Sequence, residues 1–255
     1  MNSKSPLKAK PLRNPGQSLD EQIQEIINDK LHDYLIFPAF FWVIALLEWF
    51  AQERHLERMP GIYALAASVF TAFVAIKFFQ LRRQIRQLKL GRDGEMVVGQ
   101  FLERLRKIGA HVFHDIPGDD FNLDHVVICP QGIFVIETKT HSKPDADARI
   151  TFNDGQLLVG GFATDRDPII QAKAEASWLS RTLNESTGKS FAVRGVVLYP
   201  GWFVEPVPSD IARDVWVLEP KALPVWLERE SVSLSESDVS LAAYHLSRYI
   251  RAHGK

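Results

Sequence analysis

Cysteine is nearly absent from this sequence, which has one residue of this kind, Cys129, in 255. No intramolecular disulfide can form, so a reducing compartment is expected. Charge of one sign is not in excess either, since 30 Lys and Arg stand against 31 Asp and Glu. The chain also lacks internal repeats, a G-x-x-x-x-G-K-[ST] phosphate loop and a G-x-S-x-G nucleophile elbow. These absences argue against a disulfide scaffold, a P-loop NTPase and an α/β-hydrolase.

The charge is unevenly divided along the chain. Residues 1–92 hold 13 Lys and Arg against 8 Asp and Glu, whereas the remainder holds 17 against 23. The basic part suits anionic lipid as well as nucleic acid. The acidic remainder is not a ready-made surface for binding DNA.

Two uncharged hydrophobic runs, Tyr34–Leu47 and Gly61–Ile76, lie in the basic part. Each reaches the roughly 20 residues of a spanning helix by including one charge near its end, Glu48 or Lys77. We predict a transmembrane helical hairpin, with a soluble hairpin packed on the rest of the chain or on another protomer as the alternative. Lys and Arg flank the pair on both outer sides, so both termini are expected in the cytoplasm, at a bacterial-type inner membrane. No signal peptide is expected, because no small-residue cleavage site follows the first run.

The composition predicts three parts: a disordered or amphipathic tail over 1–32, a membrane hairpin with a basic juxtamembrane helix over 33–90, and a soluble domain over 91–255. Ser18 is expected to cap a short amphipathic helix in the tail. Gly91-Arg92-Asp93-Gly94 is expected to end the helical pattern and to mark the start of the soluble domain.

Periodicity within the soluble domain predicts alternating helices and strands. Asp167-Pro168 is expected to start one helix, and Ser233 with Glu236 to cap the last. The expected helices cover 95–108, 167–183 and 233–251, and the expected strands cover 111–116, 123–129, 133–139, 149–152, 156–162, 192–199 and 215–218. This order predicts a mixed α/β domain, with a central sheet flanked by helices.

The strands around Pro130-Gln131-Gly132 carry the most informative chemistry. With Gln131-Gly132 as a two-residue turn, Asp124 opposes Lys139, and both share one face with Glu137. Burying two carboxylates and an ammonium is costly unless they bind something. A divalent cation meets that need, and Lys139 can then hold or deprotonate a water. The alternative is a structural ion-pair cluster, because E-x-K triplets are common by chance.

Four motifs in order resemble the nuclease-related domain (NERD) of the PD-(D/E)xK, restriction-endonuclease-like superfamily. They are Gly94-Glu95 at a helix start, Asn122–Val127, Gly132–Lys139 and Asp167–Gln171, and the resemblance covers Gly91 to Leu218. Asp167 stands where the family motif more often has Asn.

The resemblance implies a restriction-endonuclease-like sheet and assigns five site residues. Glu95, Asp124 and Glu137 would bind the metal, Mg²⁺ or Mn²⁺. Lys139 would be the catalytic lysine, and Gln171 would orient the site. Taken alone, Glu95 could merely favour a helix dipole and Gln171 could be an ordinary first-turn residue.

The sequence therefore predicts a membrane-anchored, divalent-metal-dependent nuclease that hydrolyses nucleic-acid phosphodiester bonds. Its expected partners are nucleic acid, DNA foremost, membrane lipids, and a second copy of the chain or a partner protein. The alternative is a catalytically inactive nucleic-acid-binding or protein-interaction module at the membrane.

Overall fold

The computed structural model describes residues 12–52, 60–153 and 155–254. Its internal contacts divide the chain into two units. One unit contains Met1–Ser18 and Leu90–Lys255, and the other contains Leu19–Lys89. Much of the predicted tail and most of the predicted link between the hydrophobic helices lie outside the described residues.

The Leu19–Lys89 unit is helical throughout its described part. Its elements are α1 (Gln17–Glu25), a π-helical segment (Ile26–Leu31), α2 (His32–Gln52) and the first two-thirds of α3 (Pro60–Leu102). Helix α1 begins at Gln17, so Ser18 lies inside the helix and the predicted cap is wrong. Helices α2 and α3 are in contact, since the rings of Phe41 and Phe70 lie 5.3 Å apart and Trp42 Nε1 donates to Thr71 Oγ1 at 3.0 Å.

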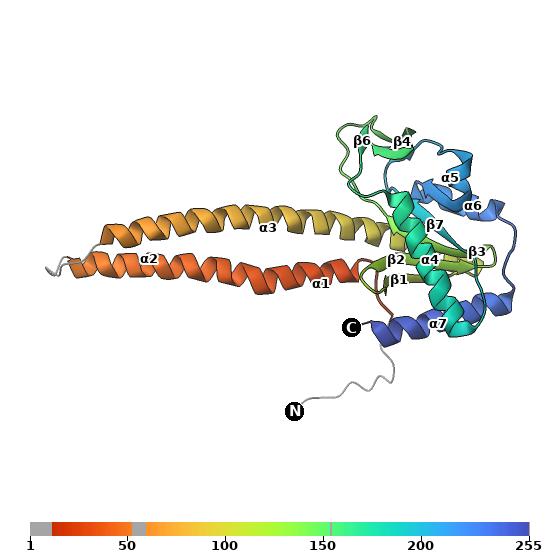
Figure 1. Ribbon diagram of the computed structural model, residues 1–255, viewed down its shortest axis with the longest axis horizontal. Helices are drawn as coiled ribbons and strands as arrows, with labels where there is room; N and C mark the ends of the chain where they lie inside the picture. The colour runs from red at the N-terminus through yellow and green to blue at the C-terminus, as the bar shows by residue number, and fades with distance from the viewer. Residues whose placement is uncertain (1–11, 53–59, 154, 255) are drawn as a thin grey trace, which may run out of the picture. The chain divides into compact units, whose positions relative to one another are not determined.

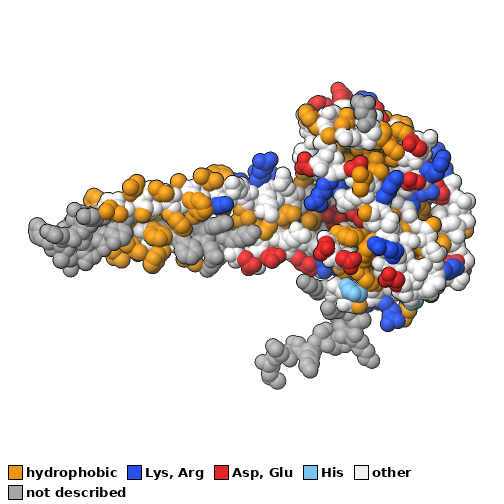
Figure 2. Space-filling model, in the orientation of Figure 1, with side chains coloured by type: hydrophobic (Ala, Val, Ile, Leu, Met, Phe, Trp, Pro, Cys, Tyr) orange, Lys and Arg blue, Asp and Glu red, His pale blue; other side chains and the backbone are white. Residues whose placement is uncertain are grey.

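The surface of this unit is strongly apolar, as the hydrophobic side chains in Figure 2 show. One described helical segment, Ala64–Ile108, is long and apolar enough to cross a membrane by length and composition, and 17% of its most apolar window is buried. Large side chains on α3 stay exposed at helical spacing: Ile62, Leu65, Val69, Phe73, Ile76 and Phe79. Exposed apolar patches of this kind mark sites of interaction with a protein or a membrane.

Helix α3 runs unbroken through Gly91–Gly94, so the predicted helix break is wrong. The local geometry explains why glycine stands at Gly94. A Cβ there would overlap the side chain of Thr140, the residue that follows Lys139. Glycine lets α3 approach the end of the third strand closely, and it thereby brings Glu95 to the edge of the sheet. A 3₁₀ turn (Glu103–Ile108) follows the helix and ends at Gly109, the predicted stop, with φ of 84°.

The other unit is built around a five-stranded mixed sheet of order β1-β2-β3-β7-β9 (Figure 1). Neighbours β1, β2 and β3 are antiparallel, whereas β7 runs parallel to both β3 and β9. The strands are β1 (His111–Pro117), β2 (Asn122–Cys129), β3 (Gly132–Thr138), β7 (Val193–Leu198) and β9 (Val215–Leu218).

Helices cover both faces of this sheet, as predicted from the sequence. On one face α4 (Pro168–Thr187) and α7 (Glu236–His253) bury side chains against β2 and β3, including Val126, Val135, Leu179 and Leu246. On the other face the end of α3 and α6 (Leu223–Arg229) pack over Val127, Phe134, Ile136 and Trp216.

A second, four-stranded sheet of order β6-β5-β4-β8 adjoins the first. The predicted hairpin forms its centre as β4 (Arg149–Asn153) and β5 (Gln156–Val159). The short strands β6 (Phe162–Ala163) and β8 (Phe203–Val204) were not predicted, nor was α5 (Ser209–Asp214). Strands of two residues have too little periodicity to be recognised in a sequence.

The helix caps confirm one prediction and correct another. Asp167 caps α4, because its Oδ1 accepts from the amides of Ile169 and Ile170, and Pro168 takes the first helical position. Ser235, not Ser233, caps α7. The Ser233 hydroxyl instead donates to the carbonyl of Gln131 at 2.9 Å and so fastens the turn between β2 and β3.

Candidate active site

The β2–β3 hairpin places Asp124 and Glu137 on one face, but in a different register from the predicted one. Ile128 pairs with Ile133 and His125 with Ile136, so the turn residues are Pro130 and Gln131. Continued by one step, this register sets Asp124 opposite Glu137 rather than opposite Lys139. The shift is two residues, and because side chains alternate with a period of two, the predicted face is retained.

Lys139 lies just past β3 and links that strand to α4. Its Nζ lies 2.7 Å from Glu137 Oε1 and donates to Gln171 Oε1 at 2.8 Å. Gln171 Nε2 in turn donates to Glu175 Oε1 at 2.8 Å. Glu137 and Glu175 are buried, whereas the Lys139 side chain is 25% exposed. The network fixes Lys139 between a carboxylate and an amide and keeps one side of it open to solvent.

Glu175 was missed in the sequence and joins the predicted residues in the structure. It lies one helical turn after Gln171, so both side chains point from α4 toward the same place. An acidic residue four positions after a glutamine has no distinctive pattern in a helix. The signal that could have found it is its spacing within the apolar face of α4, next to the buried Ala176 and Leu179.

Asp124 and Glu95 complete the cluster from β2 and α3. Asp124 Oδ2 accepts from the backbone N–H of Thr138 at 2.7 Å, which ties it to the end of β3. Glu95 is buried and accepts from the backbone N–H of Gly16. We call Glu95, Asp124, Glu137, Lys139, Gln171 and Glu175 the acidic cluster.

Burial and mutual repulsion raise the pKa of several carboxyls in the acidic cluster. Burial, Asp115 and Glu137 raise the pKa of Glu95 to about 8. Burial and Glu137 raise the pKa of Glu175 to about 9. The pKa of Asp124 is also raised, first by burial and then by Glu137. A cation bound between such carboxyls would stabilise their ionised forms strongly, because those forms are otherwise unfavourable.

The acids do not form a ready coordination shell in the described residues. No group of three or more described His, Cys, Asp or Glu side chains is arranged to hold a metal. Glu137 Oε1 is engaged by Lys139 instead, and Asp124 Oδ2 by the Thr138 amide. Protein donors thus engage one oxygen of each of these two carboxylates.

The donor set nevertheless fits a hard divalent cation. The buried atoms Glu137 Oε2 and Glu175 Oε2 accept from no N–H or hydroxyl group within the described part of the chain, and a hydrogen bond between these two carboxyls adds to the raised pKa of Glu175. Buried oxygens are seldom left without a partner. Carboxylate oxygens are the ligands that Mg²⁺ and Mn²⁺ prefer.

The raised pKa values predict an inverse dependence of stability on pH. The carboxyls of Glu95 and Glu175 bind protons more tightly in the folded than in the unfolded protein. Their stabilising effect is therefore present at acidic pH and is lost as pH rises from about 4.5 through 8 and 9. We expect the melting temperature in EDTA to fall between about pH 5 and pH 9, and Mg²⁺ to raise it at the alkaline end.

Glu175→Gln should flatten this pH dependence, whereas Glu185→Gln, at an exposed site on the same helix, should leave it unchanged. Thermal melts in a pH series test both. A wild-type melting temperature that does not fall over this range would contradict the assigned protonation of the cluster.

The histidines are not part of the acidic cluster. His114 and His125 form a buried pair with Nδ1 atoms 2.9 Å apart, and His114 Nε2 contacts Glu103 Oε1 at 2.8 Å. Burial lowers the pKa of both imidazoles. A neutral pair of this kind is suited to a structural role.

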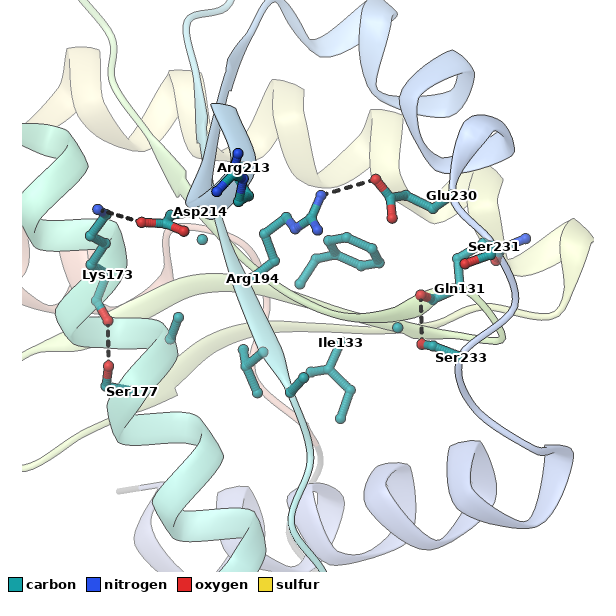
Figure 3. A pocket seen from close by; sticks show the side chains of 16 residues that line it. Gln131, Ile133, Lys173, Ser177, Arg194, Arg213, Asp214, Glu230, Ser231 and Ser233 are labelled. Atoms are coloured by element: carbon teal, nitrogen blue, oxygen red, sulfur yellow. Dashed lines mark hydrogen bonds and ion pairs between the residues drawn. The ribbon is translucent and has the colours of Figure 1, made fainter. Parts of the chain in front are cut away.

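A pocket of about 520 Å³ lies elsewhere in this unit, between the β2–β3 turn, β7 and the middle of α4 (Figure 3). Two ion pairs line it, Lys173 with Asp214 at 2.9 Å and Arg194 with Glu230 at 3.0 Å. None of its lining residues belongs to the acidic cluster. The carboxyls with raised pKa values therefore lie in the acidic cluster and not in this pocket.

The domain therefore has a central mixed sheet flanked by helices, with carboxylates, a lysine and a glutamine meeting at one end. Residues 90–200, somewhat less than half of the chain, match the family model of the nuclease-related domain. The matched segment includes every residue of the acidic cluster. Comparison with curated proteins and with solved structures gives no significant match.

Proposed function

We propose that the chain is a membrane-anchored, divalent-metal-dependent nuclease that hydrolyses phosphodiester bonds of nucleic acid, with DNA as the foremost substrate. The observation that supports this most is the acidic cluster within the segment that matches the nuclease-related domain. Four separate elements contribute its side chains: α3, β2, the end of β3 and α4.

Lys139 is the residue best placed to handle the attacking water. An ammonium has three N–H donors, and two of them are directed at Glu137 and Gln171. The third is free to hold a water at the partly exposed side of Lys139. Gln171 and Glu175 act as positioning residues, because their hydrogen bonds fix the direction of the Lys139 amine.

Asp124, Glu137 and Glu95 would hold Mg²⁺ or Mn²⁺. The metal, when bound, supplies stabilisation of the negative charge that develops on the phosphate. The carboxylates of this chain must lose their protons for this role. Lys139 also favours the charged forms of Glu95 and Glu175, and it offers a positive charge beside the scissile phosphate.

Cleavage assays on supercoiled, linear and single-stranded DNA, and on RNA, test the proposed activity. We expect cleavage of at least one substrate with Mg²⁺ or Mn²⁺ and none in EDTA. Binding without cleavage under all these conditions would favour the second candidate, an inactive nucleic-acid-binding module. The acidic charge after residue 92 is the observation in favour of that candidate.

The exposed apolar surface of α2 and α3 supports membrane anchoring. Most of the large apolar side chains of the two helices remain exposed, whereas Ala45, Ala67, Val74 and Leu81 are buried. We propose that the pair crosses the membrane as a hairpin, with both termini and the nuclease domain in the cytoplasm.

The membrane proposal predicts how the full chain fractionates. It should sediment with membranes and resist extraction by alkaline carbonate, because hydrophobic insertion is insensitive to charge screening. A reporter that is active only in the cytoplasm should be active when it is fused after Lys255, and a reporter that needs export should be inactive there. Release of the chain by high salt or carbonate would contradict the hairpin and favour a soluble helical pair.

A further inference from the structure

The residues before α1 and the first two residues of that helix pack against the nuclease domain beside Glu95. This segment, Leu12–Ser18, is called the N-terminal strap below. The sequence placed it in a tail, but it belongs to the same unit as the nuclease domain. Arg13 Nε donates to Asp115 Oδ2 at 2.6 Å, and the Ser18 amide donates to the same oxygen at 2.9 Å. The Arg13 and Asp115 side chains are 9% and 2% exposed, so this ion pair is largely shielded from water.

Asp115 has a backbone conformation that fits this role. Its φ of 49° makes it the one non-glycine residue with positive φ among those described. Such a conformation is uncommon for a residue with a side chain, and it needs support from the surroundings. Here the carboxylate receives hydrogen bonds from Arg13, from the Ser18 amide and from Asn122 Nδ2. The ion pair thus fastens the strap to Asp115, the residue of β1 with positive φ.

The strap also covers the face of α3 that carries Glu95. A Cβ at Gly99 would overlap the ring of Pro15, and a Cβ at Gly16 would lie 2.9 Å from Arg92 Cγ. Positions 92, 95 and 99 share one face of a helix, so Pro15 and Gly16 lie on either side of Glu95 along α3. The Gly16 amide donates to the Glu95 carboxylate. Gly16 has φ of 68°, which favours glycine at the point where the chain turns this amide inward.

We propose that the N-terminal strap positions Glu95 for metal binding, through the Gly16 amide, and that the Arg13–Asp115 ion pair holds the strap in place. This inference rests on the proposed nuclease function only for the role of Glu95. Arg13 acts through Glu95 and is a positioning residue. Its positive charge also offsets that of Asp115, which otherwise adds to the repulsion around Glu95.

Residue-resolved hydrogen exchange of the full chain tests the strap without any assay of cleavage. In the wild type the Gly16 and Ser18 amides should be protected. Arg13→Ala should let both exchange as in an unstructured peptide, whereas Glu95→Ala should release Gly16 alone, because Ser18 keeps its acceptor on Asp115. Arg13→Lys should retain most of the protection. Unprotected amides in the wild type, or unchanged protection in Arg13→Ala, would overturn the proposal.

Calorimetric titration with Mg²⁺ alone then tests the effect on the acidic cluster. Removing a group that orients a metal ligand typically costs about tenfold to a hundredfold in affinity. We expect a loss of this size in Arg13→Ala, partial recovery in Arg13→Lys, and none in Arg181→Ala, a control at an exposed arginine on α4. In cleavage assays the half-saturating Mg²⁺ concentration should rise equally, with KM for nucleic acid unchanged.

The two proposals fail separately. A wild type that binds Mg²⁺ without cleaving nucleic acid would remove the nuclease function and leave the strap standing. Cleavage with the same Mg²⁺ affinity in the wild type and in Arg13→Ala would remove the strap and leave the nuclease.

Discussion

Replacement of Lys139 by alanine is expected to lower the turnover of nucleic-acid cleavage by about 10²–10⁴-fold, the usual contribution of a positioned proton-handling group. The structure directs its Nζ at Glu137 and Gln171 and leaves one side open for water. Metal affinity should be retained or strengthened, because Glu137 loses a positive neighbour. Steady-state kinetics and Mg²⁺ titration of the same preparation separate the two effects.

A surface lysine provides the control for this experiment. Lys189 is exposed and pairs with Asp238, so Lys189→Ala should leave cleavage and stability nearly unchanged, as is usual for exposed ion pairs. The structural alternative gives a different result. If the Lys139–Glu137 pair served only the fold, Lys139→Ala would destabilise the protein strongly, and Mg²⁺ would not affect the wild type.

Glu137→Gln is expected to abolish metal-dependent cleavage and to weaken Mg²⁺ binding together. Glutamine keeps the size and one oxygen of the side chain but removes the charge nearest to the other acids of the cluster. Burial and Glu137 are the two main causes of the raised pKa values of Asp124 and Glu175. The substitution should therefore lower the pKa values of Asp124 and Glu175. Lys139 would then face a neutral glutamine at position 137 in place of a carboxylate.

The stability of Glu137→Gln without metal should change little, because relief of repulsion offsets the weakened contact with Lys139. Glu205→Gln, in a surface pair with Arg149, is the matched control and should behave as the wild type in every assay. Denaturant unfolding with and without Mg²⁺ measures both. A large loss of stability together with normal cleavage would show that Glu137 is structural.

The sequence predicted the face of the β2–β3 hairpin better than its register. The turn was misplaced by one residue, which shifted each pairing by two and left Asp124 and Glu137 on the same face. Because side chains alternate between faces with a period of two, a register shift of two residues leaves each side chain on its predicted face. The same shift changes which residues are paired, so the predicted pairing of Asp124 with Lys139 was wrong.

The helix break predicted at Gly91–Gly94 from local sequence was wrong. Two glycines within four residues are typical of a helix end, yet α3 continues because Gly94 meets Thr140, 46 positions later in the chain. The strap and Glu175 were missed for the same physical reason. Arg13 finds Asp115 across 102 positions, and Glu175 acquires its meaning only when α4 packs beside β3. Contacts at such separations have no local periodicity to reveal them.

The most direct measurement of the central claim is the rate of nucleic-acid cleavage by the purified full chain as a function of Mg²⁺ concentration, for the wild type and for Glu137→Gln. We predict that the wild-type rate rises to saturation with Mg²⁺ and vanishes in EDTA. The variant should show no metal-dependent cleavage across the same range. Equal rates for the two proteins, or a wild-type rate that ignores Mg²⁺ and EDTA, would contradict the assignment of the acidic cluster as a metal-dependent nuclease site.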